Sequence, residues 1–229
     1  MPAPTLSLIM PVLDEASTIA ATLDSLQPLI QRGVEVIVVD GGSRDDTAAL
    51  AAPLCTRVIE ASPGRARQMN QGAAAARGDR LLFLHADTRL PPGADRLIDG
   101  ALAGRHCWGR FDVCLEGTPR LLSVIAAAMN QRSRLTGIAT GDQALFMTRE
   151  AFEAVGGFPE QPLMEDIEMS RRLKRRSSPA CLRQRVVSSG RRWERQGAWA
   201  TIRLMWALRW RYWRGESPER LAREYRHVR

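Results

Sequence analysis

Three short stretches in the first 90 residues decide the fold: residues 6–12 read Leu-Ser-Leu-Ile-Met-Pro-Val, residues 34–39 read Val-Glu-Val-Ile-Val-Val, and residues 80–84 read Arg-Leu-Leu-Phe-Leu. Apolar runs of this length, rich in β-branched and large aliphatic side chains, are typical of strands buried on both faces of a parallel sheet. Residues 57–60 form a shorter run of the same kind. We therefore expect four strands in this part of the chain.

Helical segments separate these strands. Residues 15–26, 46–54 and 64–77 are rich in Ala, Leu and Gln, and they follow Ser, Asp or Pro positions that commonly start helices. Strand and helix in alternation predict a doubly wound α/β fold. Ligands of such folds bind in the crevice at the carboxyl ends of the strands.

The second half of the chain is less regular. Strand-like segments at residues 110–115 and 144–148 accompany helical segments at residues 120–134 and 167–176. We expect an α+β second half that extends the same, mostly parallel sheet. The composition shifts near residues 177–179, and we expect a helical tail beyond that point.

The overall composition excludes several classes of protein. With 229 residues, 45% of them hydrophobic and 25% charged, the chain is typical of a globular protein. No run reaches the roughly 18 apolar residues of a membrane-spanning helix. The first apolar stretch lacks a basic flank and ends in Asp14 and Glu15, which argues against a signal peptide. Because the four cysteines lack zinc-type spacing, we expect free thiols in a reducing cytoplasm.

The net charge of +8 is unevenly distributed. Residues 1–170 hold 15 arginines against 21 acidic residues, a net charge of −6. Residues 171–229 hold 18 basic residues against 4 glutamates, a net charge of +14. The basic character therefore belongs to the tail, and it concerns the location of the protein rather than its chemistry.

Polar residues stand where three of the predicted strands end. Residues 11–15 read Pro-Val-Leu-Asp-Glu, and Asp40 is followed by two glycines, which let a backbone approach a ligand closely. For Asp40 we favour hydrogen bonds to a base or ribose hydroxyl, whereas helix capping explains Asp45 and Asp46 equally well. The third strand end, residues 85–87, reads His-Ala-Asp. Its carboxylate can share a divalent cation with diphosphate oxygens, and a surface His–Asp pair is the alternative.

These motifs, in this order, resemble family-two glycosyltransferases of the GT-A fold over roughly residues 5–176. The family's Pro-x-x-Asn-Glu appears at residues 11–15 with Asp14 in place of Asn, and its Val-Asp-Asp-Gly-Ser appears as Val-Asp-Gly-Gly-Ser at residues 39–43. The remaining matches are Asn70, Gly72, Ala76, Gly78, the Gly-Gly-Phe turn at residues 156–158, and the pair Glu165 and Asp166. The family's Asp-x-Asp is His-Ala-Asp here, as is usual in a similar small bacterial subgroup.

The resemblance implies roles for individual residues. It implies a nucleotide-sugar site made of Pro11, Val12, Glu15, Asp40, Arg65, His85 and Ala86. It implies that Asp87 binds a Mn²⁺ or Mg²⁺ ion and that Asp166 is the general base. For one of the two adjacent acids, Glu165 and Asp166, helix capping is the alternative. Sugar contacts, to acceptor or donor, are expected from Asp142, Gln143 and Glu165.

Arg191 and Arg192 are the candidates for contact with the diphosphate. They stand where processive members of the family carry Gln-x-x-Arg-Trp, and the Gln is missing here. Processive polymer synthesis is therefore not expected.

The tail carries five of the six tryptophans within residues 191–214. Trp199, Trp206, Trp210 and Trp213 follow helical steps of seven, four and three, and arginines occupy the intervening faces. Such a helix, within residues 193–214, is a candidate for binding at the interface of an anionic membrane. Packing of this stripe of tryptophans on the catalytic body, or on a second copy of the chain in a homodimer, is an equally weighted alternative. Nucleic acid is the least favoured partner.

The sequence thus predicts a catalytic domain at residues 1–176, with a nucleotide-binding half at about 1–90 and an acceptor half at about 91–176, and a basic extension at residues 177–229. We expect an inverting, metal-dependent transfer of a sugar to an acceptor hydroxyl, with a UDP-sugar as the favoured donor. A lipid is one candidate for the acceptor. The alternatives are a silent membrane- or partner-binding module and a nucleotidyltransferase. The expected location is the cytoplasm, including the inner face of the membrane.

Overall fold

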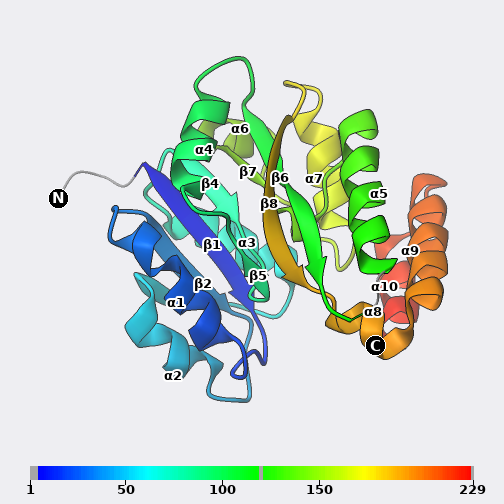
Figure 1. The fold of residues 1–229 in the computed structure, drawn as a ribbon, viewed down its shortest axis with the longest axis horizontal. Helices are drawn as coiled ribbons and strands as arrows, with labels where there is room; N and C mark the ends of the chain where they lie inside the picture. The colour runs from blue at the N-terminus through cyan, green and yellow to red at the C-terminus, as the bar shows by residue number, and fades with distance from the viewer. Residues whose placement is uncertain (1–4, 119–120, 228–229) are drawn as a thin grey trace.

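The computed structural model describes residues 5–118 and 121–227. Eight strands within these ranges form one sheet in the order β3-β2-β1-β4-β7-β6-β8-β5 (Figure 1). The strands are β1 (Leu6–Val12), β2 (Glu35–Asp40), β3 (Arg57–Glu60), β4 (Arg80–Phe83), β5 (Thr88–Arg89), β6 (Trp108–Glu116), β7 (Phe146–Thr148) and β8 (Ala180–Ser189). The strands predicted at residues 6–12 and 57–60 are confirmed at these bounds.

The sheet is mostly parallel. Strands β3, β2, β1 and β4 pair in parallel, as do β6 and β8, whereas β7 runs antiparallel to both β4 and β6 and β5 runs antiparallel to β8. The carboxyl ends of the first four strands therefore meet at one edge. This confirms the predicted α/β class with an α+β second half.

Helices cover both faces of the sheet. They are α1 (Ile19–Ile30), α2 (Thr47–Ala51), α3 (Arg65–Ala75), α4 (Ala94–Leu102), α5 (Leu121–Thr136), α6 (Arg149–Ala154), α7 (Glu165–Leu173), α8 (Arg191–Gln196), α9 (Ala198–Trp213) and α10 (Pro218–His227), with 3-10 turns at Ala52–Leu54 and Gly141–Gln143. One core cluster joins the sheet to α1, α4 and α5, and a second joins it to α3, α6 and α7.

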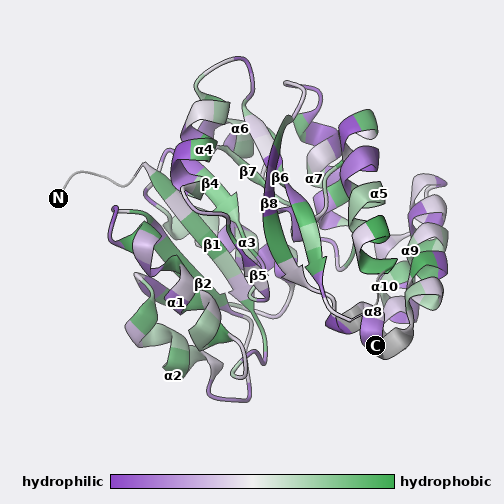
Figure 2. Cartoon of the chain, viewed as in Figure 1, coloured by the Kyte–Doolittle hydropathy of each residue, from purple (hydrophilic) through white to green (hydrophobic). Residues whose placement is uncertain are grey.

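The two clusters explain the continuous apolar runs. Leu8 and Met10 of β1 belong to the first cluster, while Ile9 belongs to the second, because successive side chains point to opposite faces of a strand. Both faces of β1 and β2 are thus covered, and Figure 2 shows apolar residues along these strands.

The tail does not begin where the sequence indicated. Strand β8 lies between β6 and β5 in the sheet, so the expected boundary near residue 177 is displaced and the helical part starts at α8. Gly197, whose φ is 77°, separates α8 from α9.

Helices α9 and α10 pack on the body of the molecule next to the start of α7. Met164, directly before α7, is buried with Leu208 of α9 and Leu221 of α10. The amide of Gln161 also donates to the hydroxyl of Tyr212 at 3.2 Å. These contacts fix α9 beside the residues Glu165 and Asp166.

Candidate active site

The carboxyl ends of β2 and β3 frame an open crevice. Its lining residues are Asp40, Gly42, Ser43, Glu60, Ala61, Ser62 and Gln71. Asp40 is almost fully buried and accepts the backbone N–H of Ser43 at 3.1 Å as well as its hydroxyl. Its carboxylate is thus held in place, and the remaining acceptor capacity faces the crevice.

The loops after β1 and β2 are joined to each other. Asp14, with φ of 54°, accepts the N–H of Arg44 at 2.8 Å, and its own N–H donates to Ser43 Oγ at 3.0 Å. Asp45 accepts the N–H groups of Ala16 and Thr47, both at 3.1 Å. Asp45 therefore has a structural role: it connects the two loops and supports the start of α2.

A second, narrower pocket lies beside the crevice. It brings together Pro11, Arg65, Met69, Phe83, Leu84, His85, Gly141, Leu145, Phe158, Glu165 and Asp166. Five of the predicted site residues therefore share one pocket although they come from four separate parts of the chain. Two others do not line this pocket: the side chains of Val12 and Ala86 are buried in the core cluster under α1, so only their backbone is left for the predicted nucleotide contact.

The acidic end of this pocket is organised by Gly141. Its N–H donates to Asp166 Oδ2 at 2.9 Å, and Asp166 Oδ1 accepts the N–H of Ile167 at 2.8 Å. A Cβ at position 141 would lie 2.4 Å from His85 Nε2, so any larger residue would displace the imidazole from this position. On the other side of the imidazole, His85 Nδ1 is 3.3 Å from Asp142 Oδ1.

Glu165 and Arg65 form an ion pair at the same pocket, with 3.2 Å between Arg65 Nη1 and Glu165 Oε1. Glu165 is almost fully buried. Burial raises the pKa of Glu165; the positive charge of Arg65 opposes this shift, and the negative charge of Asp166 adds to it. Arg65 thus pairs with Glu165 through one nitrogen, while its side chain remains 43% exposed.

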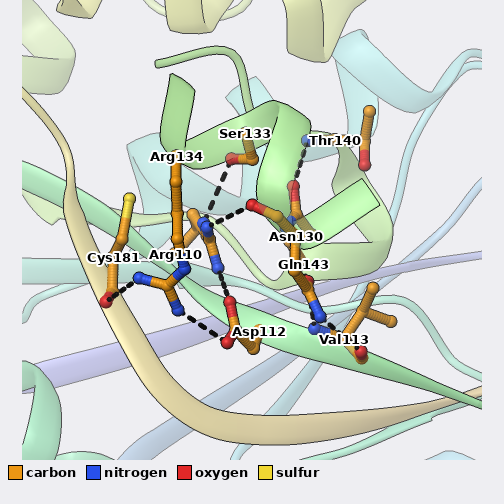
Figure 3. A network of polar contacts seen from close by, with 9 residues as sticks. All are labelled: Arg110, Asp112, Val113, Asn130, Ser133, Arg134, Thr140, Gln143 and Cys181. Atoms are coloured by element: carbon orange, nitrogen blue, oxygen red, sulfur yellow. Dashed lines mark hydrogen bonds and ion pairs between the residues drawn. The ribbon is translucent and has the colours of Figure 1, made fainter. Parts of the chain in front are cut away.

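Behind this pocket lies a buried polar network (Figure 3). Asn130 of α5 exchanges two 2.9 Å hydrogen bonds with the backbone of Val113, and its Oδ1 accepts a 3.2 Å bond from Gln143 Nε2. Gln143 is fully buried, and its Oε1 accepts the N–H of Thr140 at 3.3 Å. The prediction of a sugar contact from Gln143 is wrong, because both ends of its amide hold the loop that carries Gly141 and Asp142.

Comparison with known proteins identifies this arrangement. Residues 7–155 match the sequence model of glycosyl transferase family 2. The chain belongs to this family. Its structure also has the GT-A fold: a glucosyl-3-phosphoglycerate synthase from Mycobacterium tuberculosis with Mn²⁺, UDP and glucosyl-3-phosphoglycerate superposes with a TM-score of 0.61 at 24% identity, over 80% of this chain and 70% of that one. TarS from S. aureus with UDP gives a TM-score of 0.65 at 16% identity, over 81% and 60%.

Sequence relatives share shorter segments with this family 2 chain. The glucosyl-3-phosphoglycerate synthase of Mycolicibacterium paratuberculosis is 37% identical over 97 residues, 38% of this chain and 30% of that protein. A PGL/p-HBAD biosynthesis glycosyltransferase of Mycobacterium bovis is 37% identical over 113 residues, 46% and 44% of the two chains. The chain thus matches less than half the length of these relatives.

Asp87 of the family 2 chain fits a cation that is shared with a substrate. Asp87 follows β4 in a tight turn in which the carbonyl of His85 accepts the N–H of Thr88 at 3.1 Å. Among the residues that the structure describes, no three His, Cys, Asp or Glu side chains form a metal cluster. A carboxylate that shares its ion with phosphate oxygens needs no such cluster, since Mg²⁺ at phosphate sites commonly has one or two protein ligands. The donor set therefore fits a shared ion and not a closed protein site.

The start of α8 in this family 2 chain lies close to the loop that follows β1. Arg191 Nη2 lies 3.8 Å from Glu15 Oε2, so the structure brings together two residues predicted to contact the donor. The side chain of Arg192 lies outside the described residues.

The four tryptophans of α9 point to solvent. Their exposed fractions are 69% for Trp199, 74% for Trp206, 56% for Trp210 and 82% for Trp213. The opposite side of α9, with Thr201 and Leu208, is buried. The stripe therefore does not pack on the catalytic body. No helix in the described ranges is long and apolar enough to cross a membrane.

Sequence reasoning missed two kinds of residue. Gln68 was not singled out, yet its Nε2 donates to the carbonyls of Val12 and Val39, both at 2.8 Å, and so joins β1 to β2. Arg132 of α5 and Arg209 of α9 carry no sequence signal, because each is one arginine among many. Both are within electrostatic reach of Asp142 and Asp166.

Proposed function

We propose that the chain is an inverting, metal-dependent glycosyltransferase that moves a sugar from a nucleotide sugar, most favourably a UDP-sugar, to an acceptor hydroxyl. The observation that carries this proposal is the pocket in which Asp166, Gly141 and His85 meet beside the open crevice at the strand ends. UDP is favoured because the GT-A neighbours from M. tuberculosis and S. aureus hold UDP. A Pyrobaculum calidifontis mannosyltransferase with GDP-Man supports a test of guanine nucleotides as well.

Asp166 is proposed as the general base. Two backbone N–H groups hold its two oxygens, and each oxygen keeps a lone pair for an acceptor hydroxyl. Inversion requires one base that takes a proton from the attacking hydroxyl, and a single positioned carboxylate meets this need. The half-buried side chain of Asp166 can reach both the pocket and solvent.

The donor is proposed to lie across the crevice and the turn that follows β4. Asp40 and Glu15 would grip the nucleoside, Arg191 would approach the diphosphate, and Asp87 would hold a Mn²⁺ or Mg²⁺ ion with His85 as a neighbouring donor. When bound, such an ion neutralises the charge that develops on the departing diphosphate. Asp142 orients His85 through their 3.3 Å contact, and Glu165 holds Arg65 at the pocket wall.

A thermal-shift panel tests the donor site. UDP with Mn²⁺ should raise the melting temperature of the wild type, and the Mn²⁺-dependent part of this rise should be lost in Asp87→Asn. The matched control Asp24→Asn alters an exposed carboxylate on α1 and should keep the full rise. If no nucleotide raises the melting temperature with either cation, the donor site is wrong.

UDP release from a panel of UDP-sugars then separates the competing functions. A transferase releases UDP, and does so faster once its acceptor is present. A silent module binds the nucleotide sugar and releases nothing. A nucleotidyltransferase releases pyrophosphate from a nucleoside triphosphate.

We also propose that α9 docks on an anionic membrane surface at the inner face of the membrane. The four exposed tryptophans lie on one side of the helix, and the exposed Arg203 and Arg214 flank them, with Arg214 stacked 4.8 Å above the ring of Trp210. Tryptophan prefers the membrane interface, and the charge of +14 on residues 171–229 complements anionic lipid. Arg211 does not contribute, because it pairs with Glu216 and Glu224.

Vesicle sedimentation tests this surface. The protein should pellet with vesicles that contain phosphatidylglycerol and less with pure phosphatidylcholine, and high salt should weaken binding because it screens the arginines. The double variant Trp206→Ala, Trp213→Ala should stay in the supernatant. Absence of pelleting, with a dimer in analytical ultracentrifugation that the double variant loses, would assign the stripe to a second copy of the chain instead.

A further inference from the structure

Two half-buried arginines near the pocket have side-chain nitrogen atoms that are shielded from solvent and lack a hydrogen-bond partner among the described residues. Nε and Nη2 of Arg132, and Nε of Arg209, are shielded from solvent, and they find no acceptor within the described ranges, residues 5–118 and 121–227. Arg132 belongs to α5 and Arg209 to α9, two helices that are far apart in the sequence. Buried donors of this kind are rare in folded proteins, and each one needs an explanation.

The charges around these two arginines act on their pKa values in opposite directions. Burial, followed by the positive charge of Arg209, lowers the pKa of Arg132 to about 10, and burial also lowers the pKa of Arg209. Asp166 and Asp142 act in the opposite direction on both arginines. The third nearby cation, Arg110, is already paired with Asp112. Two like charges thus lie together next to the proposed base.

Their positions are fixed by the neighbours in sequence. Leu208, next to Arg209, is buried against Met164, the residue before Glu165 and Asp166. Arg132 lies between Asn130 and Ser133, which are held in the network behind the pocket (Figure 3). The backbone positions from which the two guanidinium groups extend are therefore held by packing and hydrogen bonds.

Such an arrangement is unfavourable in the free protein and favourable with an anion. Burial destabilises both cations and Arg209 adds repulsion to Arg132, while Asp166 and Asp142 offset a part of this cost. A phosphate or carboxylate between them would remove both costs, since guanidinium groups bind these anions through paired, charge-assisted hydrogen bonds.

We propose that Arg132 and Arg209 bind an anionic group of the acceptor, a phosphate or a carboxylate, and so hold its hydroxyl at Asp166. This inference rests on the proposed transferase function. The acceptor is favoured over the donor diphosphate because both arginines stand beside Asp166 and Asp142 on helices of the second half, whereas Asp40, Ser43 and Glu60 line the donor crevice at the opposite part of the sheet edge. An acceptor without a negative charge would leave the pair unsatisfied.

Inorganic phosphate is the probe for this site. Its effect on melting temperature is measured with UDP and Mg²⁺ present, so that the donor site is filled, and chloride at equal ionic strength is the reference. Phosphate should raise the melting temperature of the wild type by several degrees. In Arg132→Gln and in Arg209→Gln the apparent affinity for phosphate should fall about tenfold or more. The control Arg203→Gln, at an exposed position of α9, should respond like the wild type.

The same data guard against misfolding and against a non-specific effect. Because each substitution removes a buried like charge, the two variants should melt no lower than the wild type when phosphate is absent. An equal rise in all four proteins would show an adventitious ion only, and no rise in the wild type would also overturn the proposal. A phosphate-induced rise that is seen without UDP and lost when UDP is present would assign the arginines to the donor instead. The rise caused by UDP and Mg²⁺ alone reports the donor site separately, so its failure would count against the transferase function and not against the anion site.

Discussion

The first 90 residues and the region around α9 differ in how their polar and aromatic side chains are satisfied. In the first 90 residues, polar side chains bind other parts of the same chain: Gln68 joins β1 to β2, and Asn70 exchanges two 2.8 Å hydrogen bonds with the backbone of Phe158. Around α9, tryptophans are exposed, and Arg132 and Arg209 have buried nitrogen atoms without an acceptor among the described residues. The first region maintains its own shape, and the second contains groups that a ligand or surface would satisfy.

The largest difference in stability is expected between substitutions of two tryptophans, Trp108 and Trp206. Trp108 of β6 is fully buried and its indole N–H donates to the carbonyl of Ser177 at 2.9 Å, whereas Trp206 of α9 is 74% exposed. We expect Trp108→Ala to lower the free energy of unfolding by about 3–5 kcal/mol. Trp206→Ala should change it by less than about 0.5 kcal/mol. Urea denaturation measures both, and a large loss in Trp206→Ala would show that the stripe packs within the chain.

A second test concerns the link between Asn70 and Phe158. Asn70→Ala removes two hydrogen bonds and leaves the N–H and carbonyl of Phe158 without partners, so we expect a loss of about 2 kcal/mol. The neighbouring Gln71 is exposed and makes one hydrogen bond, to the carbonyl of Glu60. Gln71→Ala should therefore cost clearly less in the same assay. Equal losses would mean that the family motif at Asn70 has no special structural role.

The smallest effect is expected at Glu165 and depends on pH. Because the pKa of Glu165 is raised in the folded protein, its ionisation costs stability as pH rises above the unfolded value near 4.5. Glu165→Gln should thus melt about 2–4 °C higher than the wild type at pH 8, the change that roughly 1 kcal/mol produces in a chain of this size, and show little gain at pH 4. The exposed Glu150→Gln serves as control. Should Glu165→Gln melt lower at pH 8, the ion pair with Arg65 outweighs burial.

The strands of the first 90 residues could be predicted from sequence because their signals are local. An apolar run such as residues 6–12 has one good explanation, a strand covered on both faces, and its end then locates the crevice. Strand β8 could not be found in this way, because residues 183–185 are polar and exposed and resemble a surface segment. Its place in the sheet depends on pairing with β6, some 70 residues earlier.

The site was predictable in part for the same reason. Asp40, His85 and Asp166 stand at motif positions, and the structure puts them around the crevice and its neighbouring pocket. Gln143 was misjudged because its burial depends on Asn130, a residue of a distant helix. Arg132 and Arg209 meet only through the packing of α9 on the body, which no spacing in the sequence reveals.

The account depends most on Asp166 as the base, and one measurement tests it directly. The rate of UDP release from the donor sugar is compared between the wild type and Asp166→Asn, with Asp24→Asn as control and with UDP binding checked by thermal shift. We expect Asp166→Asn to bind UDP with Mn²⁺ like the wild type and to release UDP about 10²–10⁴-fold more slowly. An Asp166→Asn variant that releases UDP at the wild-type rate would contradict the proposed mechanism.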